Sequence, residues 1–302
     1  MATFIQQLLN GLAWGSVYAL IALGYTMVYG VLKLINFAHG EVYMMGAMTG
    51  YYVGRWTQKA DLPMALRLPV TLLGAMAACA VLGFAIERLA YKPLRSASRL
   101  SALITAIGVS LLLQNAGQLV FGADPKYFPS DSLLPYSEVV SVGEVVLSNR
   151  QLVIMVTAVV LMVALMLFVQ RTRLGRAMRA VATDKNAAQL VGIPVDRIIS
   201  LTFVIGSVLA AAAGVLVGLS NPKVEPLMGI MPGLKAFVAA VLGGIGNIAG
   251  AMLGGVLLGL VEVLVSGYGL STYRDAVAFA LLIGFLLFRP TGLLGRPDVA
   301  KV

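Results

Sequence analysis

The sequence predicts an all-α polytopic membrane protein with about eight or nine transmembrane helices, some of them broken or re-entrant. Hydrophobic residues make up 59% of the 302 residues and charged residues only 12%, whereas a soluble domain carries about 25% charged residues. The mean hydropathy of +0.91 agrees with this difference. No soluble fold of this size could bury so much apolar surface, so we expect lipid to surround most of the chain.

The apolar segments themselves are the third observation, because a helix needs about 20 apolar residues to cross the hydrocarbon core. The segments that meet or approach this length are residues 8–31, 41–52 with their flanks, 68–89, 101–121, 152–169, 198–219, 234–266 and 273–288. Segment 234–266 is too long for one crossing, and the glycine-rich interruption 243–247 divides it into a short piece and a full one. We expect residues 1–302 to form a single transmembrane domain.

The basic residues predict the orientation of the chain. The net charge of +9 does not indicate a nucleic-acid partner, because the bases lie in short loops between apolar segments, and such loops face the cytoplasm. The bases expected in the cytoplasm lie in the loop after the third segment (Arg88, Lys92, Arg95 and Arg99), in loop 171–197 (Arg171, Arg173, Arg176, Arg179, Lys185 and Arg197) and in the tail (Arg289, Arg296 and Lys301). The acidic loop 122–150 is expected outside, with the N-terminus, and the C-terminus in the cytoplasm, which favours nine crossings over eight. Loop 53–67, with three bases, is the exception.

A faint internal repeat indicates how the helices are related. Gly15-Ser16-Val17 and Gly206-Ser207-Val208 each open a span rich in Ala and Gly, and each span is later followed by a glycine-interrupted segment. The two units have opposite predicted orientations. Many transporters are built from inverted repeats with broken helices at the midplane. The alternative is that Gly and Ala are simply common in membrane helices.

The residues that would support catalysis or autonomous energy coupling are absent from the sequence. The sequence contains no GxxxxGK[ST] phosphate loop. It contains a single histidine, His39, and a single cysteine, Cys79, which are too few for a metal site or a catalytic cluster. Glu262 is the only acid deep in a predicted span, which is little for a proton or sodium relay. We therefore predict no catalytic residue, no metal site and no cofactor.

Residues 36–41 place Asn36, His39 and Glu41, together with Gly40, beside a membrane span. The structural interpretation is a helix start, with Asn36 as a cap and Glu41 in the positive first turn. The functional interpretation is a broken helix whose free amides face a translocation pathway or a partner. Gly246 and Asn247, in the interruption of the long segment, are candidates for the same role.

A polar stripe follows one face of the fourth segment, where Ser110, Gln114 and Gln118 are spaced by four residues. Polar groups at membrane depth must face protein or water. The stripe could hydrogen-bond to a neighbouring helix, which is the common use of such residues, or line a pathway.

The loop 171–197 predicts a short cytoplasmic helix over residues 184–191, with Thr183 as its cap. Ala187, Ala188, Leu190 and Val191 give it a small apolar face, and Gly192 suits its end. It could lie on the membrane surface or insert into a groove on a soluble partner.

Several stretches of the chain resemble one family. Residues 186–192 (NAAQLVG) resemble the EAAxxxG cytoplasmic motif of bacterial ABC-importer permeases, with Asn186 in place of the Glu. Residues 10–30 look like the first span of the LivH branch of branched-chain amino acid permeases. Similar signatures of that branch lie at 35–41 (INFAHGE), 241–251 (VLGGIGNIAGA) and 289–295 (RPTGLLG). The similarity covers essentially the whole chain.

This resemblance implies a permease subunit in the bacterial inner membrane that has no ATPase of its own. It implies as partners a second, LivM-like permease, two cytoplasmic ATP-binding subunits and a periplasmic amino acid-binding protein. Thr183, Asp184, Asn186, Ala187, Ala188 and Gly192 would then belong to the coupling helix that receives motion from the ATPases. The implied substrates are branched-chain or other hydrophobic amino acids, with urea or short amides as the alternative within the family and an ion-coupled secondary carrier as the alternative outside it.

Overall fold

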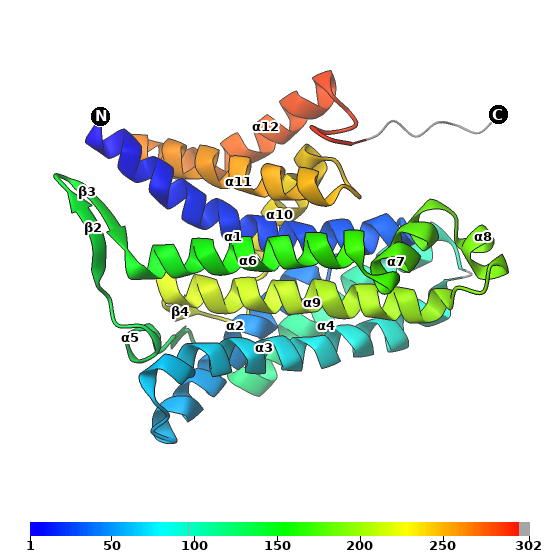
Figure 1. Ribbon diagram of the computed structural model, residues 1–302, viewed down its shortest axis with the longest axis horizontal. Helices are drawn as coiled ribbons and strands as arrows, with labels where there is room; N and C mark the ends of the chain where they lie inside the picture. Colours follow the sequence, from blue (N-terminus) through cyan, green and yellow to red (C-terminus); the bar gives the residue numbers. More distant parts are fainter. Residues whose placement is uncertain (96, 296–302) are drawn as a thin grey trace.

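The computed structural model describes residues 1–95 and 97–295, and it is built almost entirely of helices (Figure 1). Each predicted apolar segment is helical. The helices are α1 (Ala2–Leu32), α2 (His39–Lys59), α3 (Met64–Ile86), α4 (Arg99–Phe121), α5 (Ser130–Leu133), α6 (Asn149–Arg171), α7 (Arg173–Thr183), α8 (Lys185–Leu190), α9 (Val195–Ser220), α10 (Ile230–Gly243), α11 (Ile248–Val265) and α12 (Arg274–Phe288). A π-helical turn, Glu87–Tyr91, extends α3.

Six segments of the described chain are long and apolar enough to cross a membrane: Ala2–Leu32, Met64–Leu94, Leu100–Phe121, Asn149–Arg171, Val195–Ser220 and Ile248–Phe288. The predicted division of the long glycine-rich segment is confirmed, since α10 has 14 residues and α11 has 18. At 1.5 Å per residue, α10 is roughly 21 Å long, which is shorter than the hydrocarbon core of about 30 Å. This short helix is the broken element of the fold.

Helices α1 and α9 form the centre of the molecule. In the most apolar 18-residue stretch of each, 89% of α1 and 72% of α9 is buried, whereas the corresponding share is 22–28% in the outer helices α3, α4 and α6. Glycines allow this close packing. Gly15 of α1 lies against the backbone of Val256 of α11, and Gly46 of α2 lies against the backbone of Ala211 of α9. The first helix of each predicted repeat therefore packs on the glycine-rich helix of the other repeat, which is the reciprocal arrangement expected of two related units.

The two ends of the helix assembly differ in charge. The β2–β3 hairpin (Glu138–Val142 and Val145–Ser148) lies at the same end as the N-terminus, and α7 and α8 lie at the opposite end (Figure 1). A second pair of short strands, β1 (Lys126–Tyr127) and β4 (Lys223–Val224), is antiparallel. Lys92 and Arg95, after α3, pair with Asp196 at the start of α9, so the two predicted basic loops meet at one end. Arg296 and Lys301 of the tail lie outside the described residues.

Helix α7, the β2–β3 hairpin, helix α5 and the short strands β1 and β4 were not predicted from the sequence. Loop 171–197 contains helix α7 as well as α8, and the acidic loop contains the hairpin. Helix α7 was missed because it is too short and too basic to cross a membrane, although its buried Gly175, Met178 and Val181 follow a helical spacing. Gly175 is required there, because a Cβ would lie 2.3 Å from the carbonyl oxygen of Val169.

Candidate functional site

Helix α8 is capped at both ends, by Asp184 before its first residue and by a turn at Gly192 after its last. The Asp184 carboxylate accepts hydrogen bonds from the backbone N–H groups of Asn186 (2.9 Å) and Ala187 (3.0 Å). At the other end, Gly192 has φ of +84°, and Ile193 N donates to Ala188 O at 3.0 Å. This is a Schellman closure, so both ends of α8 are fixed by local sequence.

The predicted cap is wrong by one residue. Thr183 is the last residue of α7, and its hydroxyl donates to Arg179 O (3.0 Å) within that helix. Because α7 runs directly into the cap of α8, Thr183 is already helical and its side chain cannot turn towards the next helix. Asp184 is the cap instead, and α8 spans 185–190 where 184–191 was predicted.

The apolar face predicted for α8 is divided between two directions. Ala188 is 3% exposed and faces the protein, whereas Leu190 and Val191 are 89% and 76% exposed. Asn186 and Ala187 are also exposed. A cavity of about 630 Å³ lies beside α8, lined by the end of α1 and by residues near the start of α4 and α9. The outer surface of α8 therefore carries Leu190 and Val191, and the cavity lies beside the helix.

Lys185 attaches α8 to the end of α1. Its ammonium donates to Leu32 O at 3.3 Å. Burial lowers the pKa of Lys185 from its usual value, and the nearby charges of Arg95 and Lys33 lower it further. The position of α8 is thus coupled to the central helix.

Residues 36–41 form the junction between α1 and α2 inside the protein. Asn36 is 3% exposed, and its Oδ1 accepts from Ala38 N (3.1 Å) and from the Tyr91 hydroxyl (3.0 Å). The predicted cap is therefore wrong, because Ala38 occupies the cap position of α2 without a side-chain cap bond and Asn36 bonds only the N–H that precedes the helix. The expected place of Glu41 in the first turn is confirmed. Gly40 is needed for packing, because a Cβ there would lie 2.6 Å from Gly229 O near the start of α10.

His39 is buried at the crossing of α1 and α9. It is 1% exposed, and its ring meets Tyr25 edge-on at 4.7 Å. A Cβ on Gly24 of α1 would lie 2.1 Å from His39 Nε2. Within the described residues Nε2 has no hydrogen-bond partner. His39 thus fills a space that Gly24 leaves open.

Glu41 joins the polar stripe of α4. Gln114 Nε2 donates to Glu41 Oε1 at 2.8 Å, and the Ser110 hydroxyl donates to the same oxygen at 3.3 Å. This is the interhelical bonding predicted for such a stripe. The side chain of Gln118, one turn further, makes no hydrogen bond within the described residues, and the residue is half-buried. A pathway role for these residues stays a prediction.

The interruption between α10 and α11 is covered by the end of the described chain. Asn247 caps α11 by accepting from Gly250 N (3.0 Å), and its amide donates to Leu294 O (2.7 Å). Leu293 N donates to Leu242 O at 2.8 Å. Gly246, with φ of +91°, is exposed. Two stretches quoted above for their family resemblance, 241–251 and 289–295, are therefore direct structural partners.

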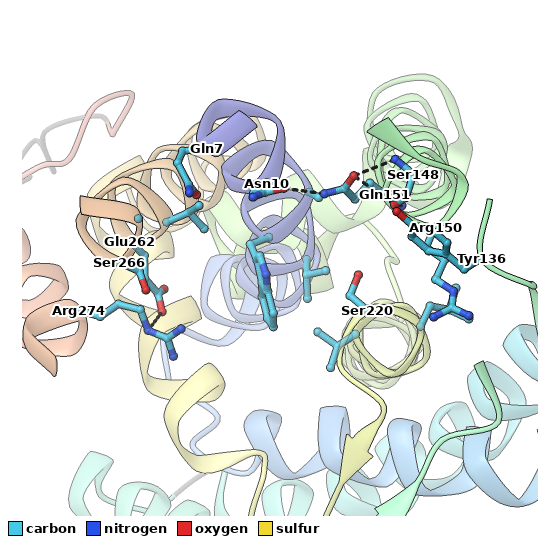
Figure 2. Close-up of a pocket in the computed structure, with 17 residues that line it drawn as sticks. Gln7, Asn10, Tyr136, Ser148, Arg150, Gln151, Ser220, Glu262, Ser266 and Arg274 are labelled. Carbon is cyan, nitrogen blue, oxygen red and sulfur yellow. Dashed lines mark hydrogen bonds and ion pairs between the residues drawn. The ribbon is translucent and has the colours of Figure 1, made fainter. Parts of the chain in front are cut away.

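A polar cavity of about 570 Å³ lies at the hairpin end, between α1, α6, α9 and α11 (Figure 2). One wall carries a charge cluster in which Lys235 and Glu262 are buried and Arg274 and Asp275 are half-exposed. Lys235 Nζ contacts Glu262 Oε1 and Asp275 Oδ1, both at 2.6 Å, and Arg274 Nε contacts Glu262 Oε1 at 2.7 Å. Sequence reasoning identified Glu262 but missed Lys235. The signal available was a lone Lys in a segment otherwise apolar enough to be buried.

The fold and these features define a polytopic helical membrane protein with a broken helix beside its centre and a capped helix pair at one end. The family model described as "Branched-chain amino acid transport system / permease component" matches residues 7–286, and the chain belongs to this family.

Two curated relatives and one solved structure show the extent of the similarity. The chain is 47% identical to the high-affinity branched-chain amino acid transport system permease protein LivH of Escherichia coli strain K12, and 49% identical to the permease protein BraD of Pseudomonas aeruginosa. Each alignment covers 99% of this chain and 98% of the relative. PsaBC from Streptococcus pneumoniae, solved with a Fab, matches at a TM-score of 0.48 and 12% identity over 95% of this chain and 92% of that one.

Proposed function

We propose that this protein is the transmembrane permease subunit of a bacterial ABC importer that moves branched-chain or similar hydrophobic amino acids across the inner membrane. The observation that carries the proposal is helix α8. It is fixed at both ends, bonded to the central helix α1, and exposes Leu190 and Val191 to the surroundings. Such a helix can receive force from a soluble partner and pass it to the core.

The energy source is expected in separate ATP-binding subunits, because the sequence has no phosphate loop. The family to which the chain belongs, together with relatives named as permease proteins, supports this division of labour. We infer two such ATPases, one on this chain and one on a second, LivM-like permease, and a periplasmic amino acid-binding protein that delivers the substrate. Membrane lipid covers the exposed apolar faces of α3, α4 and α6 that a second permease does not.

The pathway is proposed to pass beside the broken helix α10. The start of α2 packs on the start of α10, and the turn at Gly246 and Asn247 follows α10. The α4 stripe reaches this region through its hydrogen bonds to Glu41 of α2. Glu41 Oε2 is buried without a hydrogen-bond partner within the described residues, so a polar solute passing α2 would find one free acceptor.

Reconstitution of the permease tests this function. The chain is placed in proteoliposomes with its second permease, with and without the ATP-binding subunits, and leucine uptake is measured with the binding protein present. We expect uptake only with the ATPases and ATP, because the chain has no energy-converting site of its own.

Two outcomes would contradict the proposal. Ion-driven uptake by the lone chain would indicate a secondary carrier. ATP-driven uptake of urea or acetamide in place of leucine would move the substrate to the amide class within the same family.

A further inference from the structure

We propose that the 570 Å³ cavity at the hairpin end (Figure 2) is an amino acid site in which Glu262 binds the substrate ammonium and Arg274 binds its carboxylate. This inference rests on the proposed function and names the residues of this chain that would recognise a zwitterion.

Glu262 has one carboxylate oxygen without a hydrogen bond of standard length, and the Tyr18 hydroxyl of α1 is a neutral group that also interacts with this carboxylate. It is 3% exposed, and its Oε1 is occupied by Lys235 (2.6 Å) and Arg274 (2.7 Å). Its Oε2 has no hydrogen-bond partner within the described residues, although Glu262 lines the cavity. A buried carboxylate oxygen without a donor is costly. An ammonium group entering the cavity would supply that donor.

Arg274 lies beside Glu262 on the same wall of the cavity (Figure 2). Its ion pairs use Nε, and the structure gives its two terminal nitrogens no bond within the described residues. The side chain is 47% exposed. A guanidinium presents those nitrogens as a fork that matches a carboxylate. One wall thus holds a free acceptor and a free pair of donors side by side.

The charge balance of this wall favours a zwitterion. The two cations of the cluster, Lys235 and Arg274, form ion pairs with its two anions, Glu262 and Asp275, so the formal charge of the cluster is zero. A zwitterion adds no net charge to this set, whereas a cationic or anionic ligand would leave one charge uncompensated in a partly desolvated site. The walls also supply apolar surface for an aliphatic side chain, from Trp14, Val17, Val217, Leu219 and Val263.

The chain provides its own reporter for this cavity. It has two tryptophans, Trp14 in the cavity wall and Trp56 on α2, which is 58% exposed. In a Trp56→Phe background, Trp14 is the sole tryptophan. The full chain in lipid nanodiscs is titrated to 100 mM with L-leucine, with L-leucinamide (no carboxylate) and with N-acetyl-L-leucine (no ammonium), and fluorescence is recorded.

We expect a saturable change with leucine and a response at least about tenfold weaker with each analogue, since each lacks one charge-assisted hydrogen bond. Glu262→Gln and Arg274→Gln should each weaken the leucine response by a similar factor. Glu87→Gln is the matched control, because Glu87 is also buried and paired with an arginine, Arg95, but lies in the turn after α3 and does not line the cavity. It should leave the leucine titration unchanged.

The site is refuted if leucine gives no saturable change, if the three ligands act alike, or if both cavity variants titrate like the parent protein. Should Glu262→Gln fail to fold, Arg274→Gln, at a half-exposed position, decides alone. Failure of the site and failure of the function are separable. ATP-driven leucine uptake with normal titrations in both variants would remove only the site, whereas a specific titration without ATP-driven uptake would remove only the function.

Discussion

At the scale of single residues, glycine decides how closely the helices approach. Gly24 and His39 show this most directly, because the histidine ring occupies the volume in which a Cβ on Gly24 would lie. Gly206 of α9 borders the same ring, with a distance of 3.7 Å from its would-be Cβ to His39 Cε1. The only histidine of the sequence is thus part of the packing between α1, α2 and α9, a location that periodicity alone does not reveal.

Replacing Gly24 with Ala should therefore destabilise the protein. The added methyl group would overlap His39, and overpacking of this kind costs about 1–3 kcal/mol. The free energy of unfolding in detergent measures the effect. Gly108→Ala is the control, because a Cβ at Gly108 meets nothing within 4 Å, and we expect a change under about 1 kcal/mol, in the stabilising direction.

The double variant Gly24→Ala, His39→Ala should recover part of the loss, since removing the ring makes room for the methyl group. Additive losses in the double variant would show that the two residues do not compete for one space.

At the scale of elements, the short helix α8 owes its limits to local sequence and its position to the fold. Gly192 was expected at its end, whereas the cap was expected at Thr183 and is the next residue, Asp184. Helix α7 precedes α8 without a break because Met178 and Val181 pack against the protein and hold α7 in place. The Thr183 hydroxyl therefore bonds within α7 and does not cap α8. The division between buried Ala188 and exposed Leu190 is likewise a result of tertiary contacts.

Leu190→Asp should separate docking from folding. The side chain is 89% exposed, so the free energy of unfolding should change by less than about 0.5 kcal/mol. Loss of an apolar anchor and gain of a charge should reduce co-purification of the ATP-binding subunits at least about tenfold. Quantitative pull-down from membranes is the measurement.

Tyr127→Asp serves as the control for that experiment, because Tyr127 is 78% exposed on β1. Strand β1 pairs with β4, which lies at the opposite end of α9 from α8 (Figure 1). It should leave co-purification unchanged. Unaltered ATPase recovery with Leu190→Asp would show that the partner docks elsewhere. Ala188→Glu is unsuitable for this purpose, since it would bury a charge.

At the scale of the whole molecule, the helix order builds a centre from both halves of the chain. Helix α1 packs on α11 and α9 packs on α2, so neither half is complete without the other. The basic loops then gather at one end and the hairpin at the other (Figure 1).

Cysteine labelling tests which end faces the cytoplasm. Cys79 is the only cysteine in the sequence and is 1% exposed, and Cys79→Ser gives a clean background. We expect an impermeant maleimide to label Glu144→Cys, in the hairpin turn, on intact spheroplasts, because positive loops stay inside. Arg173→Cys, in α7, should react only after permeabilisation. The reverse pattern would place α8 outside and remove its proposed role.

Composition and spacing determined the environment, the helical segments and the break between α10 and α11, because these depend on local apolarity and on glycine and cap chemistry. They also identified Glu41, Ser110 and Gln114 as polar residues that need partners. Only the tertiary structure decided which partners these residues have, that His39 faces Gly24, and that Lys235, Glu262, Arg274 and Asp275 form one cluster. Those contacts join residues far apart in sequence, and the packing of whole helices, which no short window of sequence contains, determines which of them meet.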